Sequence, residues 1–236
     1  MLVVAAARRD QAARALVARW GGQTARLLTP RDLSRPGWRF DPARPADSTA
    51  VVDGQVVPAR AIAGVVNRLP WIPPRELGHI VPGDRAYVAA EMTAFLLAWL
   101  ANLDRPVLGR PGPACLAAPG WGPEQWAFAA ARAGLRARPV HQRASPAAEV
   151  GRVVHERPCV TVTVVGRRCL APGPTDRRLR WQARSLAELV GVELVAVHFS
   201  AGGADAEFLG ADPWPEVVTP EVADAIAAYL GVGTGR

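Results

Sequence analysis

Near its N-terminus the chain reads LVVAAARRDQAARALVARWGGQTARLL over residues 2–28, and this run changes character twice. It begins with an unbroken apolar run, in which Leu2 to Ala6 predict a buried strand. From Arg8 to Trp20 apolar residues recur at helical spacing, and Gly21-Gly22 ends the predicted helix. A second short strand is expected from Ala25 to Leu28. A strand, a helix and a strand at this spacing are typical of a parallel α/β unit.

The rest of the chain continues this mixed pattern. Asp53-Gly54 lies between the apolar arms of Thr49 to Pro58, which predicts a hairpin with a two-residue type I′ turn. A second hairpin is expected from Cys159 to Ala171, with Gly166-Arg167-Arg168 as its turn. The remaining expected strands are Ile62 to Asn67, Pro106 to Arg110, Arg136 to Val140, Val192 to Phe199 and Glu207 to Ala211. The remaining expected helices are Asp84 to Leu103, Pro123 to Ala133, Asp176 to Gly191 and Thr219 to Gly231.

Composition narrows the function classes. The 236 residues, 50% of them hydrophobic, are enough for one large domain or two small ones. The net charge of +7 would permit a nucleic-acid partner, but the arginines are scattered and form no block with aromatics, which argues against one. All 28 basic residues are arginine. The absence of lysine excludes a Walker-A lysine, a Schiff-base lysine and a pyridoxal anchor.

The chain shows no sign of export. No apolar run approaches the length of a membrane-spanning helix, and the charges Arg8-Arg9 follow the short apolar N-terminal run instead of preceding it, unlike a signal peptide. The cysteines, Cys115, Cys159 and Cys169, are odd in number and lack C-x-x-C spacing. We therefore expect a cytoplasmic protein with free thiols and no membrane association.

Four stretches of the sequence contain short motifs that occur together in one protein family. They are Val65 to Arg68 followed by the Glu91 helix and Arg105 to Pro111; Gly122 to Leu135; Val162 to Arg168; and Gly191 to Phe199 followed by Glu207 to Pro215. Their order resembles the ATP-grasp superfamily, in the branch of glutamate-adding ligases and graspetide macrocyclases. The resemblance implies an α/β fold, with a pre-ATP-grasp-like domain at 1–118 and a truncated, α+β ATP-grasp-like domain at 119–236.

The chain departs from this family where nucleotide and metal are bound. Family members have an aspartate where His198 stands, an arginine where Thr161 stands, and a Glu-x-Asn-x-x-Pro word where Gly210, Asp212 and Pro215 stand. Mg²⁺ requires hard oxygen ligands, so only Asp212 remains as a ligand of the family type. The family also uses lysines and a glycine-rich lid, and the interval from Val140 to Cys159 is too short for that lid.

Six residues are candidates for ligand binding. Arg68 and Arg110, each at a predicted strand end, are candidate anchors for an anionic ligand. The loop tryptophans Trp71 and Trp214 either form a contact surface for a peptide or fasten long loops to the domain.

His198 and Asp212 complete the set; if the resemblance holds, they could form a repurposed acid/base pair or a metal-binding pair. The alternative is a strand histidine that is hydrogen-bonded locally.

We therefore expect a pseudo-ligase without catalytic residues, metal or cofactor, which binds a peptide, a small acid or an active enzyme of a modified-peptide or natural-product pathway. One alternative is a minimal ATP-dependent carboxylate-amine ligase whose site is completed by another subunit, and another is a scaffold without a ligand. The exposed faces of the helices at Asp84 and Asp176 are also compatible with a homodimer.

Overall fold

The computed structural model describes residues 1–112, 115–117, 119–138 and 160–232. The chain forms two compact units: unit 1 comprises Met1–Gly120 and Glu216–Arg236, and unit 2 comprises Trp121–Pro215. The sequence prediction placed all residues after 118 in the second domain, whereas the last helix groups with unit 1. That helix is held there by an ion pair between Arg19 and Asp224 (2.9 Å) and by Leu230, which lies against Gly64.

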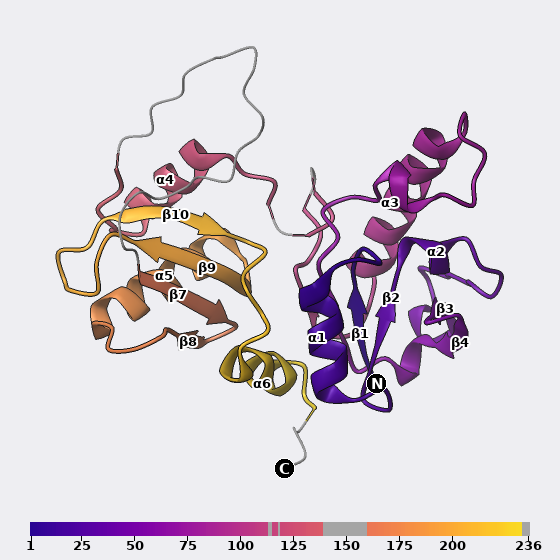
Figure 1. Cartoon of the computed structure of the whole chain (residues 1–236), viewed down its shortest axis with the longest axis horizontal. Coiled ribbons are helices and arrows are strands. Elements are labelled where there is room, and N and C mark those ends of the chain that lie inside the picture. The colour runs from indigo at the N-terminus through magenta and orange to yellow at the C-terminus, as the bar shows by residue number, and fades with distance from the viewer. Residues whose placement is uncertain (113–114, 118, 139–159, 233–236) are drawn as a thin grey trace. The chain divides into compact units, whose positions relative to one another are not determined.

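Unit 1 is built on a four-stranded parallel sheet (Figure 1). Its strand order is β2-β1-β5-β6, with Leu2 of β1 paired to Ala25 on one side and to Gly64 on the other. The strands are β1 (Leu2–Ala5), β2 (Ala25–Leu28), β5 (Gly64–Asn67) and β6 (Val107–Leu108). The predicted parallel α/β unit is therefore confirmed.

The helices of unit 1 are α1 (Gln11–Trp20), α2 (Pro30–Leu33), α3 (Arg85–Ala101) and α6 (Pro220–Tyr229), with short 3₁₀ turns η1 (Pro45–Asp47), η2 (Ala59–Ala61) and η3 (Pro74–Glu76). Helix α1 begins later than predicted because the Asp10 carboxylate caps it, accepting a hydrogen bond from the Ala13 amide (2.9 Å). Helix α3 begins at Arg85, and Asp84, with which the predicted helix starts, precedes it without a side-chain capping hydrogen bond.

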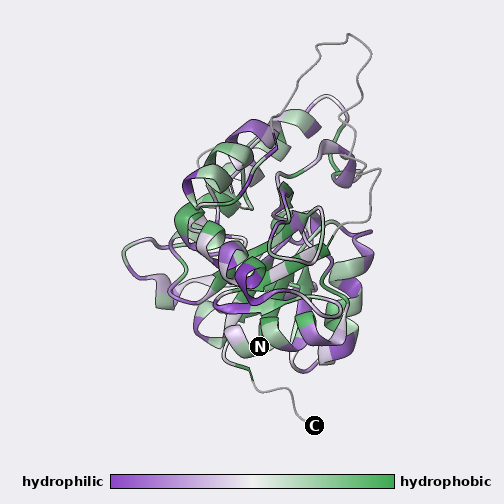
Figure 2. Cartoon of the chain, turned by 90° about the vertical axis from the view of Figure 1, so that its left-hand side faces the viewer, coloured by the Kyte–Doolittle hydropathy of each residue, from purple (hydrophilic) through white to green (hydrophobic). Residues whose placement is uncertain are grey.

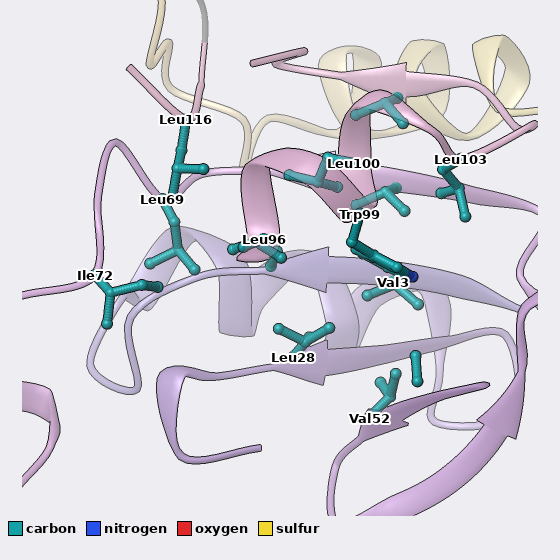
Figure 3. Close-up of a cluster of buried hydrophobic side chains, with 14 of the residues drawn as sticks. Val3, Leu28, Val52, Leu69, Ile72, Leu96, Trp99, Leu100, Leu103 and Leu116 are labelled. Carbon is teal, nitrogen blue, oxygen red and sulfur yellow. The ribbon is translucent and has the colours of Figure 1, made fainter. Parts of the chain in front are cut away.

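The main core of unit 1 lies between the sheet and α3 (Figure 3). Val3 and Leu28 of the sheet meet Leu96, Trp99 and Leu100 of the helix, and all five are buried. The alternation of side chains along β1 leaves Leu2 and Val4, also buried, on the opposite face. Both faces of the sheet are thus covered, as parallel sheets require.

A hairpin of β3 (Thr49–Val52) and β4 (Gln55–Pro58) adjoins this sheet. Asp53 and Gly54 both have positive φ, 51° and 72°, which confirms the predicted type I′ turn. The buried Asp32 carboxylate holds the turn by accepting hydrogen bonds from the Gly54 amide (2.9 Å) and from the Thr29 amide and hydroxyl (2.9 and 2.7 Å).

Unit 2 contains an antiparallel sheet of order β10-β9-β7-β8, packed against helices α4 and α5. The elements are β7 (Val160–Val165), β8 (Arg168–Leu170), β9 (Leu194–Phe199), β10 (Phe208–Asp212), α4 (Pro123–Arg132) and α5 (Arg177–Val190). Arg168 lies in β8 and not in the turn as predicted. Of the strand expected near Arg136, only Ala137 forms an isolated bridge, with Phe208. Residues 139–140 and Cys159 lie outside the described residues.

Hydrophobic residues concentrate in the strands, and hydrophilic ones lie mostly on helices and turns (Figure 2). Among the described residues, no helix has the length and apolar character needed to cross a membrane. The described residues form a mixed α/β chain with one parallel sheet, one four-stranded antiparallel sheet and the two-stranded β3-β4 hairpin.

Candidate functional site

The strand order of unit 1 reverses between β1 and β5, because β2 follows β1 on one side while β5 lies on the other. In open α/β sheets, ligands bind outside the carboxyl ends of the strands at such a reversal. Asp10 comes from the loop after β1, and Arg68 directly follows β5. The Arg68 Nε lies 2.9 Å from the Asp10 carboxylate, and the two side chains are only 11% and 18% exposed. A shielded ion pair therefore stands at this position.

Asn67 fixes the backbone beside the ion pair. Its buried side-chain amide donates hydrogen bonds to the carbonyl oxygens of Gly109 (3.1 Å) and Leu116 (2.6 Å), and its oxygen accepts one from the Leu69 amide (3.1 Å). Gly109 has φ of +74°, and a Cβ atom there would collide with the Asn67 carbonyl oxygen. We call Asp10, Asn67, Arg68 and Gly109 the unit 1 edge site.

Two further predicted residues lie near this edge in sequence and register. The parallel pairing of Val66 with Leu108 brings Arg68 and Arg110 to the same edge of the sheet. The exposed Arg110 guanidinium donates a hydrogen bond to the Arg105 carbonyl oxygen (3.4 Å). The Trp71 side chain is 58% exposed, which makes it a large apolar surface available to a partner.

Unit 2 carries the other predicted residues. His198 on β9 pairs with Thr161 on β7 and with Gly210 on β10, and the His198 Nδ1 lies 3.0 Å from the Thr161 hydroxyl. Asp212 is two residues beyond Gly210, so it shares a sheet face with His198. We call Thr161, His198, Gly210 and Asp212 the unit 2 sheet face.

The carboxylate of Asp212 is also engaged locally. It accepts a hydrogen bond from the backbone amide of Trp214 (2.8 Å). The indole nitrogen of Trp214 is buried without a hydrogen-bond partner among the described residues. Trp214 is therefore partly buried, whereas Trp71 is largely exposed.

Sequence reasoning missed Asp10, which was expected within the first helix. Asp10 lies just before the helical pattern of apolar residues that starts at Ala12, and an aspartate at that position is a helix-capping signal. Reading that signal would have placed Asp10 between the first strand and the first helix. Among the described residues, no cluster of three or more histidine, cysteine, aspartate or glutamate side chains could hold a metal ion.

Comparisons with known proteins identify the fold. No protein-family model matches the chain, and no curated protein matches its sequence. Among solved structures, it resembles the macrocyclase MdnC bound with precursor peptide MdnA from Microcystis aeruginosa MRC, with a TM-score of 0.67 at 12% identity, covering 98% of this chain and 99% of that chain.

Two further structures agree. A RiPP-associated ATP-grasp ligase from Chryseobacterium gregarium, in complex with ADP and a leader and core peptide, has a TM-score of 0.66 at 12% identity, covering 98% of this chain and 96% of that one. The ATP-grasp ligase PsnB, with a minimal precursor variant, Mg and ADP, has a TM-score of 0.65 at 13% identity, covering 97% and 98%. The chain therefore has the fold of the ATP-grasp ligases.

Proposed function

We propose that this protein binds a peptide and does not catalyse nucleotide-dependent ligation. The observation that carries the proposal is the unit 2 sheet face, where one carboxylate, Asp212, stands with a histidine, a threonine and a glycine. The similar solved structures hold precursor peptides, or a leader and core peptide, bound to ligases of the same fold. A role beside a peptide-modifying enzyme, in the cytoplasm, belongs to the same proposal.

The residues of the unit 2 sheet face do not fit a magnesium nucleotide. Mg²⁺ prefers near-octahedral oxygen coordination, commonly with one or two carboxylates and the phosphates, whereas His198 offers nitrogen and Gly210 offers no side chain. The His198 ring is already hydrogen-bonded to Thr161, and the Asp212 carboxylate to a backbone amide. The chain has no lysine to bind phosphate or to stabilise an acyl-phosphate.

The unit 1 edge site, together with Trp71 and Arg110 near it, has properties that suit a peptide. Trp71 offers an exposed aromatic side chain, and tryptophan is enriched among the residues that dominate binding energy at interfaces. Arg68 offers a guanidinium group held in place by Asp10, and a carboxylate of a ligand would compete with Asp10 for it. We propose that Arg110, on the same edge, assists in binding an acidic group.

Calorimetric titration tests the nucleotide part. Purified protein is titrated with Mg-ATP and with a non-hydrolysable analogue at low salt, and Asp212→Ala serves as the matched variant. We expect no saturable heat in either form. Saturable binding that is lost in Asp212→Ala would overturn the proposal and make this a reduced ATP-dependent ligase.

Selection from a library of random peptides of about twelve residues tests the peptide part. An enriched peptide is synthesised and titrated against the wild type, Trp71→Ala and, as a control, Tyr87→Ala, another exposed aromatic residue of unit 1. We expect Trp71→Ala to weaken binding roughly tenfold, or about 1.4 kcal/mol, and the control to change it little. Equal binding by all three proteins would remove the unit 1 edge from the proposal, and no enrichment would contradict peptide binding.

A further inference from the structure

The exposed apolar residues of unit 2 are concentrated on its two helices. The large apolar side chains that are exposed in the described part of unit 2 are Trp121, Phe128, Trp181 and Leu189. Trp121 precedes α4, Phe128 lies on α4, and the other two lie on α5. Single exposed apolar residues are ordinary on protein surfaces, but several on one pair of neighbouring helices mark a candidate interaction surface.

Arginines surround the aromatic residue of α5. At 3.6 residues per turn, Arg177 and Arg178 lie one turn before Trp181, and Arg184 lies one turn after it. Trp181 is 58% exposed. We call Arg177, Arg178, Trp181, Arg184 and Glu188 the α5 stripe.

The arginines of the stripe differ in whether they have an ion-pair partner. The Arg184 Nε lies 3.2 Å from the Glu188 carboxylate, so the C-terminal half of the stripe is close to neutral. Arg177 and Arg178 are exposed, and neither makes an ion pair with a described residue. The nearby Asp176 carboxylate accepts a hydrogen bond from the backbone amide of Arg178 (2.7 Å) and not from its guanidinium group. The unpaired positive charge therefore lies at one end, next to the exposed indole.

We infer that the α5 stripe docks an acidic peptide segment that also carries an apolar side chain. Its carboxylates pair with Arg177 and Arg178, because planar guanidinium groups bind carboxylates with two parallel hydrogen bonds. Its apolar side chain packs on Trp181, since an indole supplies a large, rigid contact area. This site is separate from the unit 1 edge site and adds a second contact to the proposed function.

The position of Glu188 favours a peptide over a nucleic acid. A phosphate backbone running along the stripe would bring negative charges against the Glu188 carboxylate, and it would have to compete with the carboxylate for Arg184. A peptide with carboxylates at one end only avoids this repulsion. Arginine beside an aromatic residue also suits single-stranded nucleic acid in general, so the test includes one.

Fluorescence anisotropy provides the test on the full chain at low salt. The probes are a fluorescein-labelled peptide in which three aspartates precede a Phe-Leu pair, the same peptide with asparagines in place of the aspartates, and a labelled single-stranded oligonucleotide. We expect the acidic peptide to bind at least tenfold more tightly than either other probe. We also expect Trp181→Ala and the double variant Arg177→Ala/Arg178→Ala each to weaken it about tenfold.

Matched controls separate the stripe from general electrostatics. The double variant Arg31→Ala/Arg60→Ala removes two exposed arginines of unit 1, so its net charge changes by as much as that of Arg177→Ala/Arg178→Ala. Tyr87→Ala removes an exposed aromatic residue of unit 1. Both controls should bind within about twofold of the wild type. Any of three results would overturn the inference. They are no saturable binding of the acidic peptide at concentrations near 1 mM, equal losses of binding in the stripe and control variants, and tighter binding of the oligonucleotide. The Mg-ATP and Trp71 experiments can fail without affecting this result, because they report on other residues.

Discussion

Replacing Asn67 with alanine should destabilise the protein strongly. Among substitutions at the unit 1 edge site that do not strain the backbone, as a substitution of Gly109 would, we expect it to have the largest effect. The Asn67 side chain makes three buried hydrogen bonds, of 3.1, 2.6 and 3.1 Å, to the backbone of Gly109, Leu116 and Leu69. The bonds to Gly109 and Leu116 link the end of β5 to the segments after β6. Asn67→Ala leaves two carbonyl oxygens and one amide without their partner in a buried environment.

The magnitude follows from these three groups. Each buried polar group left unsatisfied costs about 1–3 kcal/mol. We take the lower value, because water can enter the space that the amide leaves, and obtain a total of about 3 kcal/mol. Since domains are typically stable by only about 5–15 kcal/mol, this loss would remove a large part of the margin.

Urea denaturation followed by tryptophan fluorescence measures the loss. With a slope of about 2 kcal/mol per molar urea, the midpoint should fall by roughly 1.5 M. Asn102→Ala is the matched control, because the exposed Asn102 makes one hydrogen bond, to the Ala98 carbonyl oxygen (2.9 Å), and its loss should cost about 0.5 kcal/mol. An equal shift for both variants would refute the argument that Asn67 holds the edge together.

Other predictions concern neighbouring features. Gly109→Ala should cost well over 1 kcal/mol in thermal unfolding, because its Cβ would collide with Asn67, whereas Gly134→Ala, with a similar φ of +78° but open space, should cost only about 1 kcal/mol. Asp32→Ala should cost about 3 kcal/mol in urea unfolding through its three lost hydrogen bonds, and a loss below 1 kcal/mol would contradict the role assigned to this carboxylate. Burial raises the pKa of the Cys169 thiol, so the unfolded state loses this proton first and the free energy of unfolding should decrease as pH rises above about 9. Stability measured from pH 7 to 10 should show a smaller decrease in Cys169→Ala, and identical pH profiles would count against a desolvated thiol.

Local patterns predicted most elements of the fold. The run Leu2 to Ala6, the Asp53-Gly54 turn and the β-branched arm of the second hairpin each encode their structure through neighbouring residues, and each was found. The ends of helices were less predictable, because Asp10 and Asp84 are the same residue type and only one of them caps its helix. Asp10 has the extended backbone conformation of a capping residue, whereas Asp84 has helical backbone angles (φ −99°, ψ −11°).

The site was only partly predictable for the same reason. Arg68 was identified from its place after a strand, but its partner Asp10 lies 58 positions away and is brought to it only by the pairing of β1 with β5. The membership of the last helix in unit 1 depends likewise on Arg19 and Gly64, far from it in sequence. Roles of the six candidate residues in binding stay predictions.

Helix α6 belongs to unit 1 although it follows unit 2 in the chain, and this order affects folding during synthesis on the ribosome. Unit 2 is continuous, so all of its residues have been translated before Pro220 to Tyr229 are made. The parallel sheet of unit 1, although its strands come first in the chain, lacks the helix that lies against Gly64 until residues 220–230 have been made. Domains usually fold in order from the N-terminus, but here the inserted unit should finish first. Nascent chains released near residue 215 should therefore contain a protease-resistant second unit and an unprotected first one.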